Sequence, residues 1–246
     1  TAVVASLDIS GDIDVDGTIN GVGISSNITN FAQSILISQD AGTGTLSTAS
    51  DNTGLGYDVF NVLTSGDNNT IVGAYAGDAL TTGSHNTGIG RASLSALTTA
   101  DGNTGVGSQA LRVVSTGANN TAVGYDALAT NTTGAENTAV GSEALDANTT
   151  GVENVAVGYA ALSNATAASY NTAVGRSALL VNSSGASNTA VGREALKLNT
   201  TGALNVALGS LALDANVTGS ANTAIGYNAL TANTTDGNTA VGKDAL

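Results

Sequence analysis

The chain of 246 residues offers few side chains for acid–base or nucleophilic chemistry. It has 19 Asp and Glu, six Lys and Arg, one His and no Cys. His85 lies in the turn-like stretch Gly-Ser-His-Asn, with no Cys to pair with and no Asp fixed nearby in the sequence, so no catalytic triad can be argued. We therefore predict that His85 is an exposed turn residue and that the protein is not an enzyme.

The acidic residues could supply the paired carboxylates of a glycosidase, because any two of them could meet in the fold. Asp126, Glu136, Glu143 and Glu153, however, fall at turn positions of a repeated pattern. We interpret them as solvated surface. A depolymerase remains the more remote alternative.

One acidic stretch imitates a calcium loop. Asp12-Ile13-Asp14-Val15-Asp16-Gly17 resembles the start of an EF-hand loop, but Gly23 stands where the bidentate Glu is required. The alternation of Asp with Ile and Val is better explained by a strand with one buried face. We predict no metal site and no cofactor.

Aromatic side chains recur at one point of the pattern. Tyr57, Tyr125, Tyr159 and Tyr227 each follow a Gly directly. Tyr on a surface rich in Thr and Asn could stack on a sugar of a host receptor. The alternative is an exposed side chain that covers its neighbour.

These residues belong to a repeat that begins with Asn and is written twelve times. The starting Asn residues are spaced by ten steps of 17 and a last step of 16, and they are Asn52, Asn69, Asn86, Asn103, Asn120, Asn137, Asn154, Asn171, Asn188, Asn205, Asn222 and Asn238. Four residues later comes a Gly in every copy: Gly56, Gly73, Gly90, Gly107, Gly124, Gly141, Gly158, Gly175, Gly192, Gly209, Gly226 and Gly242. We number these copies as coils 1 to 12 and count positions from the Asn as zero.

The repeat length indicates the fold. Seventeen residues cannot hold two helices, Thr-Ala-Val-Gly favours a strand, and Asn-Thr-Thr-Gly is typical of a turn. We predict an all-β protein: a parallel β-solenoid, or β-roll, of about twelve 17-residue coils, each with two short strands and two turns. Coils stacked about 4.8 Å apart would form a rod roughly 55–60 Å long.

A second Asn recurs at position 11 in the later coils, at Asn131, Asn148, Asn182, Asn199, Asn216 and Asn233, with Asn164 one place early. Stacked Asn side chains can form amide ladders along the axis. The first four coils lack this Asn, as expected of atypical terminal repeats. In coil 2 the Ala79-Leu80 pair also comes three residues late.

Alternation along the strand suggests an interface between chains. In Thr121-Ala122-Val123-Gly124 the Val can fill the coil, which leaves Ala and Gly on the other face. Such small residues let another backbone approach. We predict that this strip packs against sister chains in a homotrimeric rod, with a monomeric solenoid as the alternative, through Ala122, Ala139, Ala156, Ala173, Ala190, Ala207, Ala224 and Ala240.

Composition and charge limit the partners. The formal net charge is −13, so phosphate backbones and anionic membrane surfaces would be repelled. There is no run of 18 apolar residues, so we predict neither nucleic-acid binding nor membrane insertion. Proline is absent, which suits a ladder of central strands that must all donate their N–H groups.

Residues 1–50 carry no copy of the repeat and form a separate segment before the solenoid of residues 51–246. Alternating Leu7, Ile9, Ile13, Val15 and Ile19 predict strands. Residues 31–37 form a second apolar patch that could be helix or strand.

Two families resemble this chain. Asn-Thr-Ala-Val-Gly and Asn-Thr-Ala-Ile-Gly, as in Asn222 to Gly226, resemble the Asn-Ser-Val-Ala-Ile-Gly repeats of YadA-like heads in trimeric autotransporter adhesins. That resemblance covers about residues 52–246 and implies a trimeric β-roll that works in adhesion. The repeat here is longer than in those heads.

The second resemblance fits better. Strings of Asn-Thr-Ala-Val-Gly-Tyr-x-Ala-Leu with Asn-Thr-Thr-Gly turns look like tail-fibre proteins of tailed bacteriophages, and residues 7–19 are similar to strand modules of fibre shafts. This resemblance implies a homotrimeric, extracellular virion protein that contacts tail or baseplate proteins and a host surface receptor such as a glycan. The alternative is a bacterial cell-surface adhesin or extracellular filament subunit.

Overall fold

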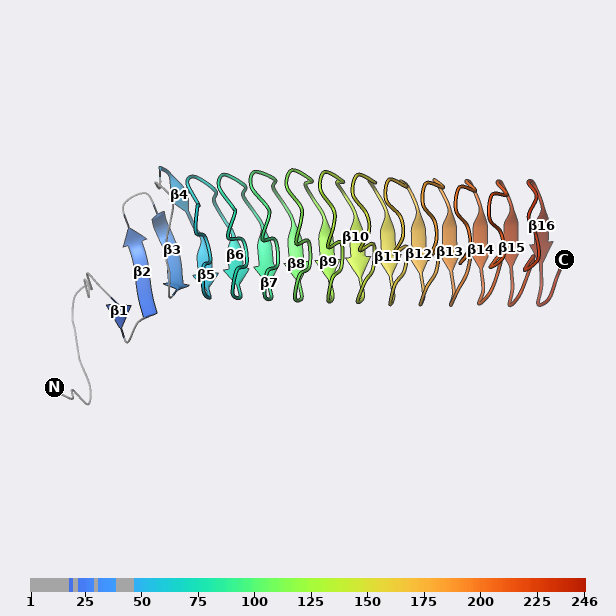
Figure 1. Cartoon of the computed structure of the whole chain (residues 1–246), viewed down its shortest axis with the longest axis horizontal. Coiled ribbons are helices and arrows are strands. Elements are labelled where there is room, and N and C mark those ends of the chain that lie inside the picture. The colour runs from blue at the N-terminus through green and yellow to red at the C-terminus, as the bar shows by residue number, and fades with distance from the viewer. Residues whose placement is uncertain (1–17, 20–21, 29–30, 39–46) are drawn as a thin grey trace.

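The protein is a rod of stacked coils. The computed structural model describes residues 18–19, 22–28, 31–38 and 47–246; the strands predicted within residues 7–17 and the Asp12–Gly17 stretch lie outside them. Along the rod runs one 16-stranded sheet, and its strands form a nearly straight row (Figure 1). The described residues contain strands and turns but no helix. The predicted β-solenoid is confirmed.

A short N-terminal group of strands precedes the coils, namely β1 (Thr18–Ile19), β2 (Val22–Ile28), β3 (Phe31–Ser38) and β4 (Ala49–Ser50). Each coil then contributes one three-residue strand: β5 (Thr53–Leu55), β6 (Thr70–Val72), β7 (Thr87–Ile89), β8 (Thr104–Val106), β9 (Thr121–Val123), β10 (Thr138–Val140), β11 (Val155–Val157), β12 (Thr172–Val174), β13 (Thr189–Val191), β14 (Val206–Leu208), β15 (Thr223–Ile225) and β16 (Thr239–Val241).

The prediction of two strands per coil is wrong, because left-handed backbone conformations interrupt the second one. In coil 6, Glu143 at position 6 and Leu145 at position 8 have φ of 59° and 52°. Glu136, just before the coil, has φ of 58°. Extended strands need negative φ, so only positions 1 to 3 form a strand and the rest of the coil turns.

Neighbouring coils are joined around their whole circumference. The strands pair in parallel and in register, so Ala139 lies opposite Ala122 and Ala156. Outside the strands, Glu143 N–H donates to Tyr125 O in the preceding coil at 2.9 Å, and Leu145 N–H donates to Ala161 O in the following coil at 3.0 Å. Each coil is therefore stable only against its neighbours.

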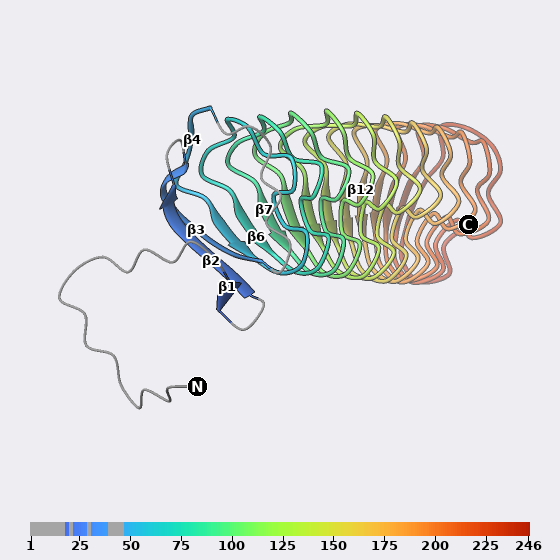
Figure 2. The same ribbon diagram turned by 60° about the vertical axis from the view of Figure 1, so that its left-hand side comes forward.

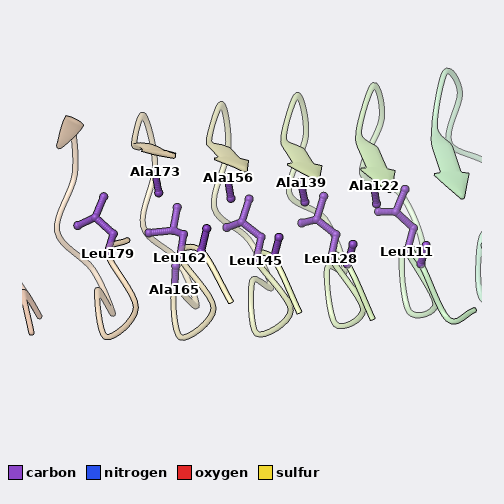
Figure 3. Packing of buried hydrophobic residues seen from close by; sticks show 14 of the residues in the cluster. Leu111, Ala122, Leu128, Ala139, Leu145, Ala156, Leu162, Ala165, Ala173 and Leu179 are labelled. Carbon is purple, nitrogen blue, oxygen red and sulfur yellow. The ribbon is translucent and has the colours of Figure 1, made fainter. Parts of the chain in front are cut away.

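The core is a thin layer of Ala and Leu, and here the structure corrects the predicted faces. Ala139 points into the coil towards the row of leucines that includes Leu128 and Leu145, and all three are fully buried (Figure 3). Val140 lies outside with 37% of its surface exposed. The whole predicted inter-chain strip is interior, because Leu at position 8 reaches across from the opposite wall and leaves room only for Ala or Gly at position 2. The strip consists of Ala122, Ala139, Ala156, Ala173, Ala190, Ala207, Ala224 and Ala240, all at most 6% exposed.

The first two coils follow the same size rule with the residues exchanged. Coil 1 places Phe60 at position 8 against Gly54, whereas coil 2 places Ile71 at position 2 against Gly77. Leu80 is at position 11 of coil 2, buried like Leu63 at the same position of coil 1. Coil 2 therefore keeps the total side-chain volume of its core but distributes it differently. Its late Ala-Leu pair is not a displaced copy of the usual pair.

Strand β3 covers the N-terminal end of the core. It pairs antiparallel with β2 and parallel with β4 and β5, with Leu36 opposite Gly54. Leu36 is fully buried and would touch a methyl group placed on Gly54. The apolar patch at residues 31–37 is thus a strand, and Figure 2 shows it next to the first coil at the N-terminal end of the row of coils.

The repeat Asn at position zero forms a buried amide ladder along the rod. Asn137 donates from Nδ2 to Asn120 Oδ1 at 3.1 Å and to Gly151 O at 2.8 Å. Its Oδ1 accepts from the backbone N–H and from Nδ2 of Asn154, both at 3.0 Å. Buried amides are costly unless bonded, so the ladder fixes the spacing of the coils.

The predicted second ladder at position 11 is confirmed, but it is interrupted. Asn148 donates to Asn131 Oδ1 at 3.0 Å, and Asn199 donates to Asn182 Oδ1 at 2.8 Å. Buried Ala165 occupies the position between these two runs. In coils 1 to 4 the position holds the buried apolar residues Leu63, Leu80, Leu97 and Val114.

We predict that replacing a repeat glycine destabilises the rod through stacking more than through backbone strain. Gly141 has φ of +134°, and an added methyl group would lie 2.5 Å from Gly158 O in the next coil. Gly141→Ala should lower the free energy of unfolding by more than about 3 kcal/mol, since the backbone strain alone is worth about 1–3 kcal/mol. Gly242 has φ of +130° but its added methyl would meet only Ala245 Cβ at 4.0 Å. Denaturant unfolding of Gly141→Ala and Gly242→Ala should separate the two costs, and equal losses would contradict this account.

A second prediction concerns the interrupted ladder. Coils with a buried Asn at position 11 have Gly at position 14; a methyl group on Gly151 would lie 2.5 Å from Asn148 Oδ1. Coil 7 instead has Ala165 and Ala168, both buried. We expect Ala165→Asn to destabilise the protein and Ala165→Asn/Ala168→Gly to recover stability, with a favourable coupling of about 1–3 kcal/mol. Thermal unfolding of both variants and of Ala168→Gly measures this coupling, and additive effects would contradict it.

Candidate functional site

The largest repeated surface is the outward face of the strands, which we call the outer sheet face and define as positions 1 and 3 of all coils. Position 1 is Thr except for Val155 and Val206. Position 3 is aliphatic throughout: Leu55, Val72, Ile89, Val106, Val123, Val140, Val157, Val174, Val191, Leu208, Ile225 and Val241. Exposure in this row varies from partial, as at Val72 and Val157, to 47% at Leu55 and Leu208 and 68% at Val241.

The outer sheet face is flat, regular and uncharged. Its rungs follow the strand spacing, so from β5 to β16 it is roughly 53 Å long and about 10 Å wide. No position on it carries an ionisable side chain, although the net charge is −13. A continuous exposed row of aliphatic side chains of this length is characteristic of an interaction surface.

Beside the outer sheet face runs a polar column, the Tyr–Arg ridge, formed by positions 5 and 6. Tyr125 and Tyr159 are about half exposed, at 50% and 48%. The guanidinium of Arg176 lies 5.8 Å from the ring centroid of Tyr159. At the N-terminal end, Tyr57 and Tyr75 meet edge to face with centroids 5.1 Å apart. The Tyr residues singled out from sequence therefore lie on the surface in one line.

Two arginines of the ridge and a lysine beside it gather around one carboxylate. Glu194 lies 3.5 Å from Arg176, 3.2 Å from Arg193 and 3.4 Å from Lys197. The hydrogen bond from Arg193 and, less strongly, that from Lys197 lower the pKa of Glu194. These pairs are solvent-exposed, and they organise the surface more than they stabilise the fold.

Two acidic residues of the described part have raised pKa values, and each interacts with a second acid: Asp78 with Asp58 and Asp146 with Glu143. Burial raises the pKa of Asp78 and of Asp146, but the two lie at position 9 of coils 2 and 6, four coils or roughly 19 Å apart. A hollow of about 190 Å³ lined by Leu230, Ala232, Asn233 and Leu246 is smaller than an ordinary ligand pocket. Among residues the structure describes, no group of three His, Asp or Glu side chains could hold a metal ion.

His85 is where the sequence places it. It is exposed in a left-handed turn, and its backbone N–H donates to Asp67 O at 2.9 Å. Glu136 and Glu153 are likewise exposed, while Asp126 and Glu143 are half-buried on the ridge.

Comparison with protein-family models, curated proteins and solved structures finds no match to this chain. In the described segments, no helix is long and apolar enough to cross a bilayer. The surface itself must therefore carry the functional argument.

Sequence reasoning missed the aliphatic row at position 3. The signal was present, because Val, Ile or Leu stands before every repeat Gly. It was assigned to the coil interior, although Leu at position 8 already fills that space.

The contact between Glu143 and Tyr159 gives a titration prediction. The hydrogen bond to Glu143 and the negative charge of that carboxylate raise the pKa of Tyr159. Glu143→Gln should lower the pKa of Tyr159, because the ionised phenol no longer faces a carboxylate. Site-resolved NMR titration of the Tyr rings measures this change, and Glu136→Gln is the matched control that should leave the pKa where it is. If the pKa of Tyr159 is unchanged in Glu143→Gln, the contact between the two side chains is contradicted.

Proposed function

We propose that this protein is a structural subunit of a homotrimeric fibre, a tail fibre of a tailed bacteriophage that contributes to host attachment. The observation that carries the proposal is the outer sheet face, an exposed aliphatic row that runs the length of the described coils. Three chains whose faces meet on a common axis would remove these rows from water. The resemblance of the repeats to fibre and adhesin sequences supports the same arrangement.

The size of the surface agrees with self-association. Together with its flanking columns, the face offers on the order of 1,000 Å² per chain, while stable interfaces bury about 800 Å² per partner. A second copy is also the partner that matches a repeat of constant spacing over twelve coils. Burial of one Val per coil then adds up along the rod, which suits a mechanical fibre.

Attachment would follow from repetition. Three chains would display three Tyr–Arg ridges along the solvent-exposed margins of their interfaces, each with the same groups repeated along a rigid rod. Weak contacts with a host surface receptor, such as a glycan, would gain strength by multivalency. The function proposed for the chain therefore needs no catalytic group.

The test is the oligomeric state of the chain in solution. Light scattering coupled to size exclusion should give three times the mass of one chain. Val140→Lys should weaken the trimer by at least about 100-fold, because three ammonium groups would be buried without partners. Thr133→Lys changes an exposed residue of a turn outside the outer sheet face and should leave the trimer intact.

A monomeric wild-type chain would overturn the proposal. The location of the protein is tested separately, by electron microscopy with an antibody against the chain. Label on virion tails supports the tail fibre, and label on bacterial cell surfaces supports the adhesin alternative.

A further inference from the structure

Coil 10 departs from the repeat around the outer sheet face. It has Leu204 just before the coil, Val206 at position 1, Leu208 at position 3 and Leu211 at position 6, and we call these four residues the aliphatic belt. The position before the coil is Asn119, Glu136, Glu153, Tyr170, Ser187 and Ala221 in the neighbouring coils. Position 6 is Asp126, Glu143, Ala160, Ser177, Glu194 and Asn228. Coil 10 alone has large aliphatic residues at all four places.

The two leucines at the edges of the belt occupy unfavourable conformations. Leu204 and Leu211 both have φ of 60°, and a left-handed conformation costs a residue with a side chain about 1–2 kcal/mol. Leu204 is 63% exposed, so packing within its own chain does not offset that cost. Val206 and Leu208, between them, are 39% and 47% exposed. A belt of this kind calls for a cover from outside the chain.

We infer that Leu204 of one copy packs against Leu211 of the neighbouring copy, with the chains parallel and their coils at equal height. The inference rests on the proposed self-association and adds its register and its anchoring residues. Leu204 and Leu211 lie on opposite edges of the outer sheet face in the same coil. In a ring of identical chains, one edge of each chain meets the other edge of the next at the same height. The two leucines then meet without any axial shift.

Other registers are poorer. A shift by one coil would place Leu204 against Glu194 or against Asn228, which are both polar. Antiparallel registers do not arise in a three-fold ring, because chains related by rotation about an axis along the rod are parallel.

The equal-height register also suits coils 7 and 8. It sets Glu153 opposite Ala160, and it sets Tyr170 opposite Ser177 and next to Arg176, where an aromatic face can meet a cation. In coil 6 it sets Glu136 near Glu143, a like-charge pair at the rim, where solvent and salt screen it.

The experiment uses the absence of cysteine from the chain. Single variants Leu204→Cys and Leu211→Cys are co-expressed, oxidised, and analysed by non-reducing electrophoresis. A disulfide needs Cα atoms within about 7 Å, so a cross-linked dimer is expected only if these positions face each other across two chains. Leu204→Cys with Glu194→Cys, and Leu204→Cys with Asn228→Cys, are the controls shifted by one coil. These shifted pairs should cross-link at no more than about a tenth of the yield of the Leu204→Cys and Leu211→Cys pair.

A higher yield from either shifted pair, or from Leu204→Cys alone, would overturn the inferred register. A second measurement uses Leu204→Asn/Leu211→Asn, which introduces the residue that coils 5 and 11 carry at these positions. The protein concentration at which the trimer dissociates should rise at least about tenfold in this variant, since burial of a Leu contributes about 1.5–3 kcal/mol. Ser187→Asn in coil 9 is the matched control and should leave association unchanged.

The outcomes separate the two proposals. A wild-type chain that is monomeric by light scattering defeats the proposed fibre and this inference together. A wild-type trimer without a Leu204→Cys/Leu211→Cys cross-link defeats the inference alone.

Discussion

The rod depends on holding successive coils one strand spacing apart. Backbone hydrogen bonds cross from coil to coil at nearly every second residue, and the Asn at position zero adds a side-chain bond network of the same spacing. At that separation the glycines at position 4 face the carbonyl of the next glycine, as Gly141 faces Gly158, with no room for a methyl group. The stacking distance therefore explains why Asn at position zero and Gly at position 4 are the same in every copy of the repeat.

The same constraint makes the core thin. At positions 2 and 8 together, each coil has space for one large and one small side chain, and their total volume matters more than its distribution. Ile71 with Gly77 replaces the usual Ala with Leu, and Phe60 with Gly54 does so in the coil before. A core of this kind cannot stabilise an isolated coil, so the shield provided by Leu36 and the continuity of the ladders decide where the rod can begin.

How far the sequence predicts this structure can be judged from coil 6. The repeat length, the β-solenoid and the strand Thr138–Val140 follow from spacing and residue type, and so does the ladder at position 11. The direction of Ala139 does not, because alternation tells which residues share a face but not which face is inside. That choice is made by Leu145, which reaches the interior from a turn that no strand pattern describes. The ladder at position zero was likewise not predicted, since an Asn used as a marker of the repeat gives no sign of its burial.

Correcting the inward face changes where function can lie. Residues that point inward are limited by the stacking distance and the core volume. Positions 1, 3 and 5 and the residue before each coil point outward and are free of both constraints, as is position 6 except at the buried Ala160 and Ser177. A departure from the repeat at an inward position, such as Ile71, is compensated within the chain, because Gly77 leaves room for the larger side chain. The departure at Leu204 has no such answer within the chain, because its side chain is 63% exposed, and Leu211 is only half-buried, although both carry the conformational cost of a left-handed turn. The rest of the surface repeats from coil to coil. Uncompensated departures from this repeat therefore mark the places where a partner contributes the missing contacts.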